Sequence, residues 1–181
     1  MGIVLDRVAV PPLIDKLKSF TSRAVVPEEV PESFSSKLIF TIVLIDQLTK
    51  GYVNQNSDLL IKTVNIFPFL NFVFVTNTGV SFGLLSGLDI TLYLGIISII
   101  ISIFLFRWLI NSKDLVEAFG ISLIIAGAIG NGIDRIIDGY VIDFIDIYYK
   151  SFHWPSFNIA DSSITLGVVT YFYRNLTLKA K

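Results

Sequence analysis

The 181-residue sequence contains no cysteine, and His153 is its single histidine. The absence of cysteine excludes disulfide bonds, thiolate nucleophiles and zinc sites built on sulfur ligands. One histidine also excludes a cluster of histidine metal ligands within the chain. We therefore expect neither a metal ion nor another cofactor.

Charged residues are also scarce, at 16% of the sequence, and the 14 Lys and Arg residues nearly balance the 15 Asp and Glu residues. No stretch interleaves basic with aromatic residues, so a nucleic acid partner is not expected. Hydrophobic residues instead make up 53% of the chain, and the mean hydropathy is +0.71. This composition lies outside that of ordinary soluble domains and indicates a protein embedded in lipid.

Apolar segments predict four membrane-spanning helices, at residues 38–53, 90–110, 118–137 and 155–173. The first segment is of marginal length, whereas the second has no charge before Arg107. Between them, residues 66–85 are rich in β-branched and aromatic side chains around Pro68, which predicts short strands with a tight turn. The expected fold is mainly α and integral to the membrane, with a small β element at the surface.

The distribution of lysine and arginine predicts the orientation in the membrane. These residues gather before the first span, after the second span and in the C-terminal tail, so both termini should be cytoplasmic. Residues 1–36 contain no long apolar run, which predicts no cleavable signal peptide and leaves a helix on the membrane surface or a solvated arm. We expect this cytoplasmic arm, one membrane domain over residues 37–175 and a cytoplasmic tail over residues 176–181.

Two polar patterns lie within the predicted spans, where an ionisable group costs about 2.5 to 3.5 kcal/mol and is by default a functional candidate. Asp46 and Lys50 share one helical face, and we interpret them as a structural ion pair, with direct catalysis as the alternative. In the third span, a stripe at i+4 steps lies beside Asp134 and consists of Gly127, Asn131 and Arg135. Small residues favour helix packing, whereas the adjacent acid and base indicate a polar pocket.

Two further aspartates precede and open the fourth span. Gly139 is expected to end the third helix, so that Asp143 follows in an extended or re-entrant segment. Asn158 and Asp161 match a capping box at a helix N-terminus, which favours an ionised carboxylate. If the two helix ends meet at the outer face, Asp143 and Asp161 form a pair that shares one proton. Such a pair can activate water and protonate a leaving group, as aspartic peptidases do.

Three other residues leave alternatives open. Asp146 lies three residues after Asp143 and competes for its role. His153 could be a base but has no candidate partner, so we place it in the aromatic belt at the membrane interface, beside Phe152 and Trp154. Asn77 could either cap a turn or bind the backbone of a substrate.

The sequence resembles the lipoprotein signal peptidase family, also called signal peptidase II, over residues 38–175. Five motifs carry the resemblance, in this order: "DQLTK" at 46–50, "TNTGVSFG" at 76–83, "GAIGNGIDR" at 127–135, "VIDFID" at 141–146 and "FNIADSSI" at 157–164. Each motif is weak alone, but their order and spacing together are specific. The sequence departs from the family in its longer N-terminal arm and in Gly132, where bulkier residues are common.

The resemblance implies four transmembrane helices in the bacterial inner membrane, with a small β element and a short loop helix on the outer face. It implies an aspartic endopeptidase that removes the signal peptide of a prolipoprotein just before a cysteine carrying diacylglycerol. Asp143 and Asp161 match the catalytic dyad, and Asp46 matches an acid needed mainly for integrity. The candidates for substrate binding or support are Asn77, Gly127, Asn131, Asp134, Arg135, Asn158 and Ala160. We expect a monomer, which cyclic peptide antibiotics that mimic the substrate should inhibit.

Two other functions fit parts of the pattern. Intramembrane Asp, Arg and Asn also line ion paths, which would make the protein a small transporter or a proton relay. Such a path predicts polar residues throughout the depth of the membrane, whereas here they gather near one face. The other function is a structural or partner-binding membrane protein, in which the same residues only cap and pair helices.

Overall fold

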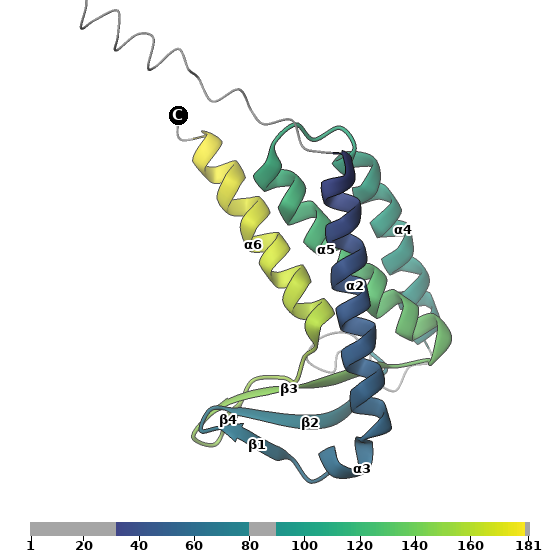
Figure 1. Cartoon of the computed structure of the whole chain (residues 1–181), viewed down its shortest axis with the longest axis vertical. Helices are drawn as coiled ribbons and strands as arrows, with labels where there is room; N and C mark the ends of the chain where they lie inside the picture. Colours follow the sequence, from purple (N-terminus) through teal and green to yellow (C-terminus); the bar gives the residue numbers. More distant parts are fainter. Residues whose placement is uncertain (1–31, 80–89, 180–181) are drawn as a thin grey trace, which may run out of the picture.

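The computed structural model describes residues 32–79 and 90–179. Four long helices lie side by side, and a four-stranded antiparallel sheet lies at one end of the bundle (Figure 1). The helices are α2 (Glu32–Gln55), α4 (Thr91–Leu109), α5 (Leu115–Ile137) and α6 (Ile159–Lys179). Each covers most of one predicted span, although α2 begins before residue 37 and α6 continues past residue 175. The fold is therefore mainly helical with a small antiparallel sheet, as predicted.

Within the described residues, two helices are long and apolar enough to cross a membrane, α4 and α5. Helix α4 presents large apolar side chains to its surroundings, and Phe104 is 79% exposed. Helix α5 lies at the centre of the bundle and packs against α2, α4 and α6 (Figure 1). Its buried side chains include Ile121 and Ile125, which form a core cluster with Leu109 and Ala118.

Helices α5 and α6 are in close contact at Gly127. A Cβ atom added to this residue would lie 2.2 Å from the backbone oxygen of Ala160. Ala160 itself is fully buried. The absence of a side chain at Gly127 thus lets the start of α6 lie directly against α5.

The sheet has the strand order β1 (Val64–Phe67), β2 (Leu70–Asn77), β3 (Val141–Tyr149) and β4 (Phe152–His153). The predicted strands and tight turn are present in β1 and β2, while positions 80–85 of that prediction lie outside the described residues. Strand β3 pairs with β2 so that Asp143 is opposite Val75. A short helix, α3 (Ser57–Leu60), connects α2 to the sheet.

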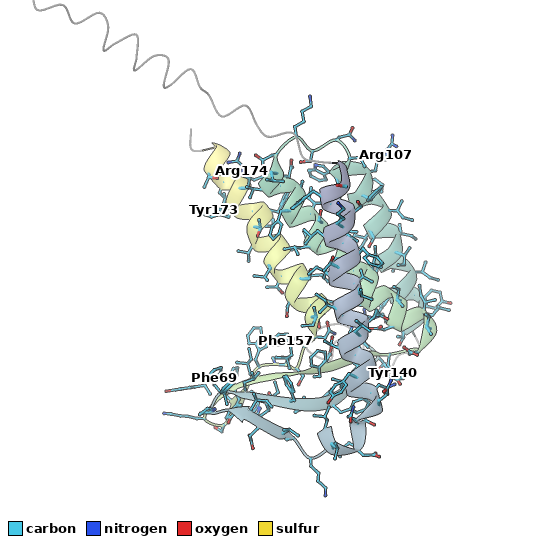
Figure 2. The ribbon with its side chains drawn as sticks, in the orientation of Figure 1. Phe69, Arg107, Tyr140, Phe157, Tyr173 and Arg174 are labelled. Atoms are coloured by element: carbon cyan, nitrogen blue, oxygen red, sulfur yellow. The ribbon has the colours of Figure 1, made fainter. Side chains whose placement is uncertain are left out.

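A second core cluster joins the sheet to the end of α2. It consists of Val53, Leu60, Ile142 and Phe144. Figure 2 shows Phe69 in the turn between β1 and β2 and Phe157 near the start of α6, whereas Arg107 and Arg174 lie at the opposite end of the bundle. Gly139 ends α5 with φ of +77°, the left-handed conformation that glycine adopts without strain. The chain then enters β3, which places Asp143 in an extended segment as predicted.

Candidate active site

Asp143 and Asp161 come from different elements and line the same groove. Asp143 lies in β3 and is buried, and Asp161 lies in the first turn of α6. The groove has a volume of about 1180 Å³ and runs between the sheet and the start of α6. Asn77 of β2 is a further lining residue. The fold thus brings together two acids that are far apart along the chain.

Asn158 bonds to both aspartates. Its Nδ2 donates to Oδ1 of Asp143 over 2.7 Å, and its Oδ1 accepts from the backbone N–H of Asp161 over 2.9 Å. Oδ2 of Asp161 in turn accepts from the backbone N–H of Asn158 over 3.2 Å. This reciprocal pair is the predicted capping box, and it also fixes one acid relative to the other.

Two more amide side chains orient the carboxyl groups. Nδ2 of Asn77 donates to Oδ2 of Asp143 over 3.0 Å, while its Oδ1 accepts from the backbone N–H of Gly79 over 3.0 Å. Asn77 therefore caps a turn and also contacts the dyad. Nδ2 of Asn131, in α5, donates to Oδ1 of Asp161 over 2.8 Å. All four carboxyl oxygens of the two aspartates therefore accept a hydrogen bond.

The two carboxyl groups differ in electrostatic environment. Burial, and secondly the negative charge of Asp161, raise the pKa of Asp143 from its ordinary value to about 6. The hydrogen bonds from Asn77 and Asn158 oppose this rise only in part. Asp161 lies in the first turn of a helix, where its Oδ2 accepts from the backbone N–H of Asn158. Below its raised pKa, Asp143 carries a proton, which suits it for the role of an acid.

Lys50 lies behind the dyad in a buried polar network. Its Nζ donates to Oδ2 of Asp46 over 2.7 Å, to Oδ2 of Asp134 over 2.6 Å and to Oδ1 of Asn131 over 2.8 Å. The predicted contact between Asp46 and Lys50 is present and extends to a neighbouring helix. Because Lys50 holds the oxygen of Asn131, the amide nitrogen of Asn131 is directed at Asp161.

Asp134 points toward α2 and does not line the groove. Its Oδ1 accepts from Nε2 of Gln47 over 2.7 Å and its Oδ2 from Lys50. Sequence reasoning had not singled out Gln47, although it lies within the "DQLTK" motif. Asp46 is fully buried, and its Oδ1 accepts from the backbone N–H of Ala160 over 2.8 Å. This bond fixes the start of α6, and Ala160 and Gly127 complete the close helix contact described above.

Arg135 is buried beside this network. Its Nη2 donates to the backbone oxygen of Gly79 over 2.9 Å, and its Nη1 donates to the backbone oxygen of Asn131 over 3.4 Å. Its Nε has no hydrogen-bond partner among the described residues. The guanidinium thus ties α5 to the chain just after β2 and adds positive charge near the dyad.

Two interpretations of neighbouring residues were wrong. Asp146 does not compete with Asp143, because it lies outside the groove lining and its Oδ2 accepts from Nδ2 of Asn71 over 2.8 Å. His153 does have a partner, since its Nδ1 lies 2.9 Å from both carboxyl oxygens of Asp146. The sequence places the two residues seven positions apart, and only the reversal of the chain between β3 and β4 brings them together.

Comparisons with known proteins identify the family. A model of the family described as signal peptidase (SPase) II matches residues 38–177. The chain belongs to the signal peptidase II family. A lipoprotein signal peptidase of Thermodesulfovibrio yellowstonii is 47% identical over 140 residues, which cover 76% of this chain and 91% of that protein. One of Wigglesworthia glossinidia brevipalpis is 39% identical over 141 residues, covering 77% of this chain and 92% of that protein.

The fold is also similar to that of a solved bacterial membrane enzyme. The chain matches a bacterial membrane enzyme solved at 2.3 Å resolution with a TM-score of 0.73 and 36% identity, over 82% of this chain and 91% of that one. The family assignment makes the protein an aspartic peptidase that acts on signal peptides. This assignment therefore argues against the alternative functions considered above, which were a transporter, a proton relay and a purely structural membrane protein.

Proposed function

We propose that this signal peptidase removes the signal peptide from bacterial prolipoproteins and that Asp143 and Asp161 form its catalytic dyad. The main support for this dyad is the position of Asn158, which forms hydrogen bonds with both aspartates. The raised pKa of Asp143 and the helix N-terminus at Asp161 support different roles for the two acids.

In the proposed reaction, Asp161 is the base and Asp143 the acid. Asp161 takes a proton from a water molecule, whose oxygen forms a bond to the carbonyl carbon of the scissile peptide. Asp143 gives its proton to the carbonyl oxygen, which yields a neutral tetrahedral intermediate. When the C–N bond breaks, the proton on Asp161 passes to the leaving amine. A hydroxyl proton of the intermediate returns to Asp143, so the dyad ends in its starting state.

The surrounding residues position the two acids. Asn77, Asn131 and Asn158 donate to the carboxyl groups and limit their rotation. Behind them, Lys50 forms salt bridges to Asp46 and Asp134 and donates a hydrogen bond to Asn131. The positive charge of Arg135 interacts with both Asp143 and Asp161 and suits stabilisation of negative charge near the dyad.

The proposed substrate carries diacylglycerol on the cysteine that follows the cleavage site. A lipid-anchored cysteine stays near the outer interface of the membrane, and we place the groove between the sheet and the start of α6 at that depth. The groove lining supports this substrate, because it combines the two acids with apolar side chains such as Leu166, Phe152 and Trp154. Anchoring in the membrane also lowers the entropy lost when the peptide is positioned.

We further propose that all four long helices cross the bacterial inner membrane and that both termini are cytoplasmic. Arg107 and Arg174 lie at the end of the bundle away from the sheet, as the positive-inside rule requires (Figure 2). The cysteine-free chain allows a direct test with Asn111→Cys, between α4 and α5, and Ser151→Cys, between β3 and β4. An impermeant maleimide added outside should label only Ser151→Cys, and labelling of Asn111→Cys alone would reverse the orientation.

The protein is proposed to act as a monomer and to bind cyclic peptide antibiotics that resemble the substrate. Within the described residues, hydrogen bonds inside one chain hold both members of the dyad. A cyclic peptide in the groove should compete with the substrate and raise the melting temperature of the enzyme in detergent. Inhibition without competition would place the antibiotic elsewhere.

The assignment of the dyad is tested with Asp143→Asn, Asp161→Asn and the control Asp138→Asn. Asp138 is exposed at the end of α5, on the same side of the bundle as the groove. In membranes that contain equal amounts of each variant, the first two should leave the prolipoprotein uncut and Asp138→Asn should cleave normally. Cleavage by either dyad variant at the rate of the control would refute the assignment.

A further inference from the structure

One wall of the groove is formed by the β3–β4 hairpin (residues 146–154). Its aromatic side chains belong to the groove lining: Tyr148, Tyr149, Phe152 and Trp154. The strand pairing that holds this wall is short, because β4 has two residues, paired as Tyr148 with His153 and Tyr149 with Phe152. A pairing of this length is not stable by itself. Other contacts must therefore fix the wall.

The turn between the two strands has an unfavourable backbone conformation. Lys150 has φ of 55°, a left-handed conformation that a residue with a side chain adopts only when surrounding contacts hold it there. The hairpin thus combines short strand pairing with an unfavourable turn. Two further backbone hydrogen bonds support it, from the Trp154 N–H to the oxygen of Ile147 over 2.8 Å and from the Tyr148 N–H to the oxygen of Phe69 over 3.0 Å, and interactions between side chains add to them.

His153 and Asp146 supply such an interaction. Nδ1 of His153 lies 2.9 Å from both carboxyl oxygens of Asp146. An ionised carboxylate only accepts hydrogen bonds, so Nδ1 of His153 is the donor. When the imidazole is protonated, this becomes a charge-assisted hydrogen bond. The imidazole also stacks on the ring of Tyr148, with centroids 5.2 Å apart and planes 16° apart.

The same carboxylate connects the hairpin to the other strands. Asp146 is buried, and its Oδ2 accepts from Nδ2 of Asn71 on β2 over 2.8 Å. Oδ1 of Asn71 accepts from Nδ2 of Asn65 on β1 over 2.5 Å. One chain of side-chain hydrogen bonds thus crosses the sheet from β1 to β4. The buried carboxyl group of Asp146 thus has side-chain partners on two neighbouring strands, Asn71 and His153.

The chain between the hairpin and the dyad is anchored separately. Phe157 and Ile145 form two backbone hydrogen bonds, from the Phe157 N–H over 3.0 Å and from the Ile145 N–H over 2.9 Å. Beyond this bridge, Asn158 holds both catalytic aspartates. The tip of the hairpin can therefore move without moving the dyad, because this fixed segment lies between them.

We propose that His153, through its bond to Asp146, is a positioning residue that holds the aromatic wall of the groove for substrate binding. The inference rests on the proposed function, because it assigns the hairpin to the side of the groove that binds the substrate peptide. Loss of the bond lets the hairpin move away from the groove, which weakens binding, while the dyad keeps its geometry. The pair therefore acts on KM and leaves kcat unchanged.

The test measures kcat and KM of the full-length enzyme in detergent micelles, with a synthetic diacylglyceryl prolipoprotein peptide as substrate. His153→Phe keeps a ring that can stack on Tyr148 but removes the donor to Asp146. Asp146→Asn keeps the shape but leaves one carbonyl oxygen for two donors. In each variant KM should rise about tenfold, the usual effect of losing one charge-assisted hydrogen bond, with kcat unchanged.

Two further variants make the test decisive. His153→Gln retains an N–H donor and should give an intermediate KM, and Ser151→Ala, in the exposed turn, should leave KM unchanged. If His153→Phe fails to accumulate in the membrane, His153→Gln and Asp146→Asn decide the outcome. The proposal would be overturned if KM is unchanged in the variants of both His153 and Asp146, or if kcat falls instead. This result is distinct from failure of the proposed dyad, which would appear as retained kcat in Asp143→Asn.

Discussion

Nδ2 of Asn158 lies 2.7 Å from Oδ1 of Asp143, so a residue at the start of α6 holds a carboxyl group on β3. The same side chain caps the helix turn that contains Asp161. One amide therefore fixes the relative position of two acids that belong to different elements. The proposed chemistry depends on this arrangement, because a shared water molecule must reach both carboxyl groups.

The raised pKa of Asp143 predicts the pH dependence of the enzyme. The folded-state pKa is about 6, above the ordinary value of 3.8, because of burial and the charge of Asp161. The acid form is present below this pKa and is lost as the pH rises through it. The value of kcat/KM should therefore fall above about pH 6, by roughly tenfold per pH unit. A profile that stays level up to pH 8 would contradict the role of Asp143 as the acid.

Lys50→Met should destabilise the protein strongly. The substitution leaves Asp46 and Asp134 buried without their shared cation, and removal of one partner from a buried ion pair costs about 3 to 5 kcal/mol. Activity should also fall, because Asn131 loses the contact that directs its amide at Asp161. Thermal unfolding in detergent measures the first effect, with Lys62→Met, an exposed residue in the turn after α3, as the control. Equal melting temperatures for the two variants would show that the network contributes little.

Gly127→Ala tests the close contact between α5 and α6. The added Cβ would lie 2.2 Å from the backbone oxygen of Ala160, so the start of α6 must shift. We expect a loss of about 1 to 3 kcal/mol in stability, together with reduced activity, because Asp161 moves with the helix. Gly51→Ala is the matched control, since a Cβ at Gly51 meets nothing within 4 Å. It should stabilise α2 by up to about 1 kcal/mol.

Local sequence patterns were sufficient to predict most of the elements. The apolar runs located α2, α4, α5 and α6, and the β-branched stretch located β1 and β2. Gly139 and the capping box at Asn158 were predictable because each depends on residues adjacent in the sequence. The ion pair of Asp46 and Lys50 was predictable for the same reason, since both lie on one helix.

Contacts between distant segments were not predictable from such patterns. Nothing local to Asp134 shows that it faces Gln47 and Lys50, because that contact depends on how α2 packs against α5. The pairing of β2 with β3, which brings Asn77 to Asp143, likewise depends on the tertiary fold. His153 was placed in an aromatic belt because its partner Asp146 is reached only across the hairpin. Periodicity describes one element at a time, whereas these contacts join two.

The central claim is that Asp143 and Asp161 act as one catalytic unit, and a double-substitution cycle tests it most directly. Cleavage of a synthetic prolipoprotein is measured for Asp143→Asn, Asp161→Asn and the variant with both changes. Each single variant should lose about 10²-fold to 10⁴-fold in kcat, and the double variant should lose no more than the more damaging single change. Losses that multiply in the double variant, or a single variant with normal kcat, would contradict a dyad that works as a unit.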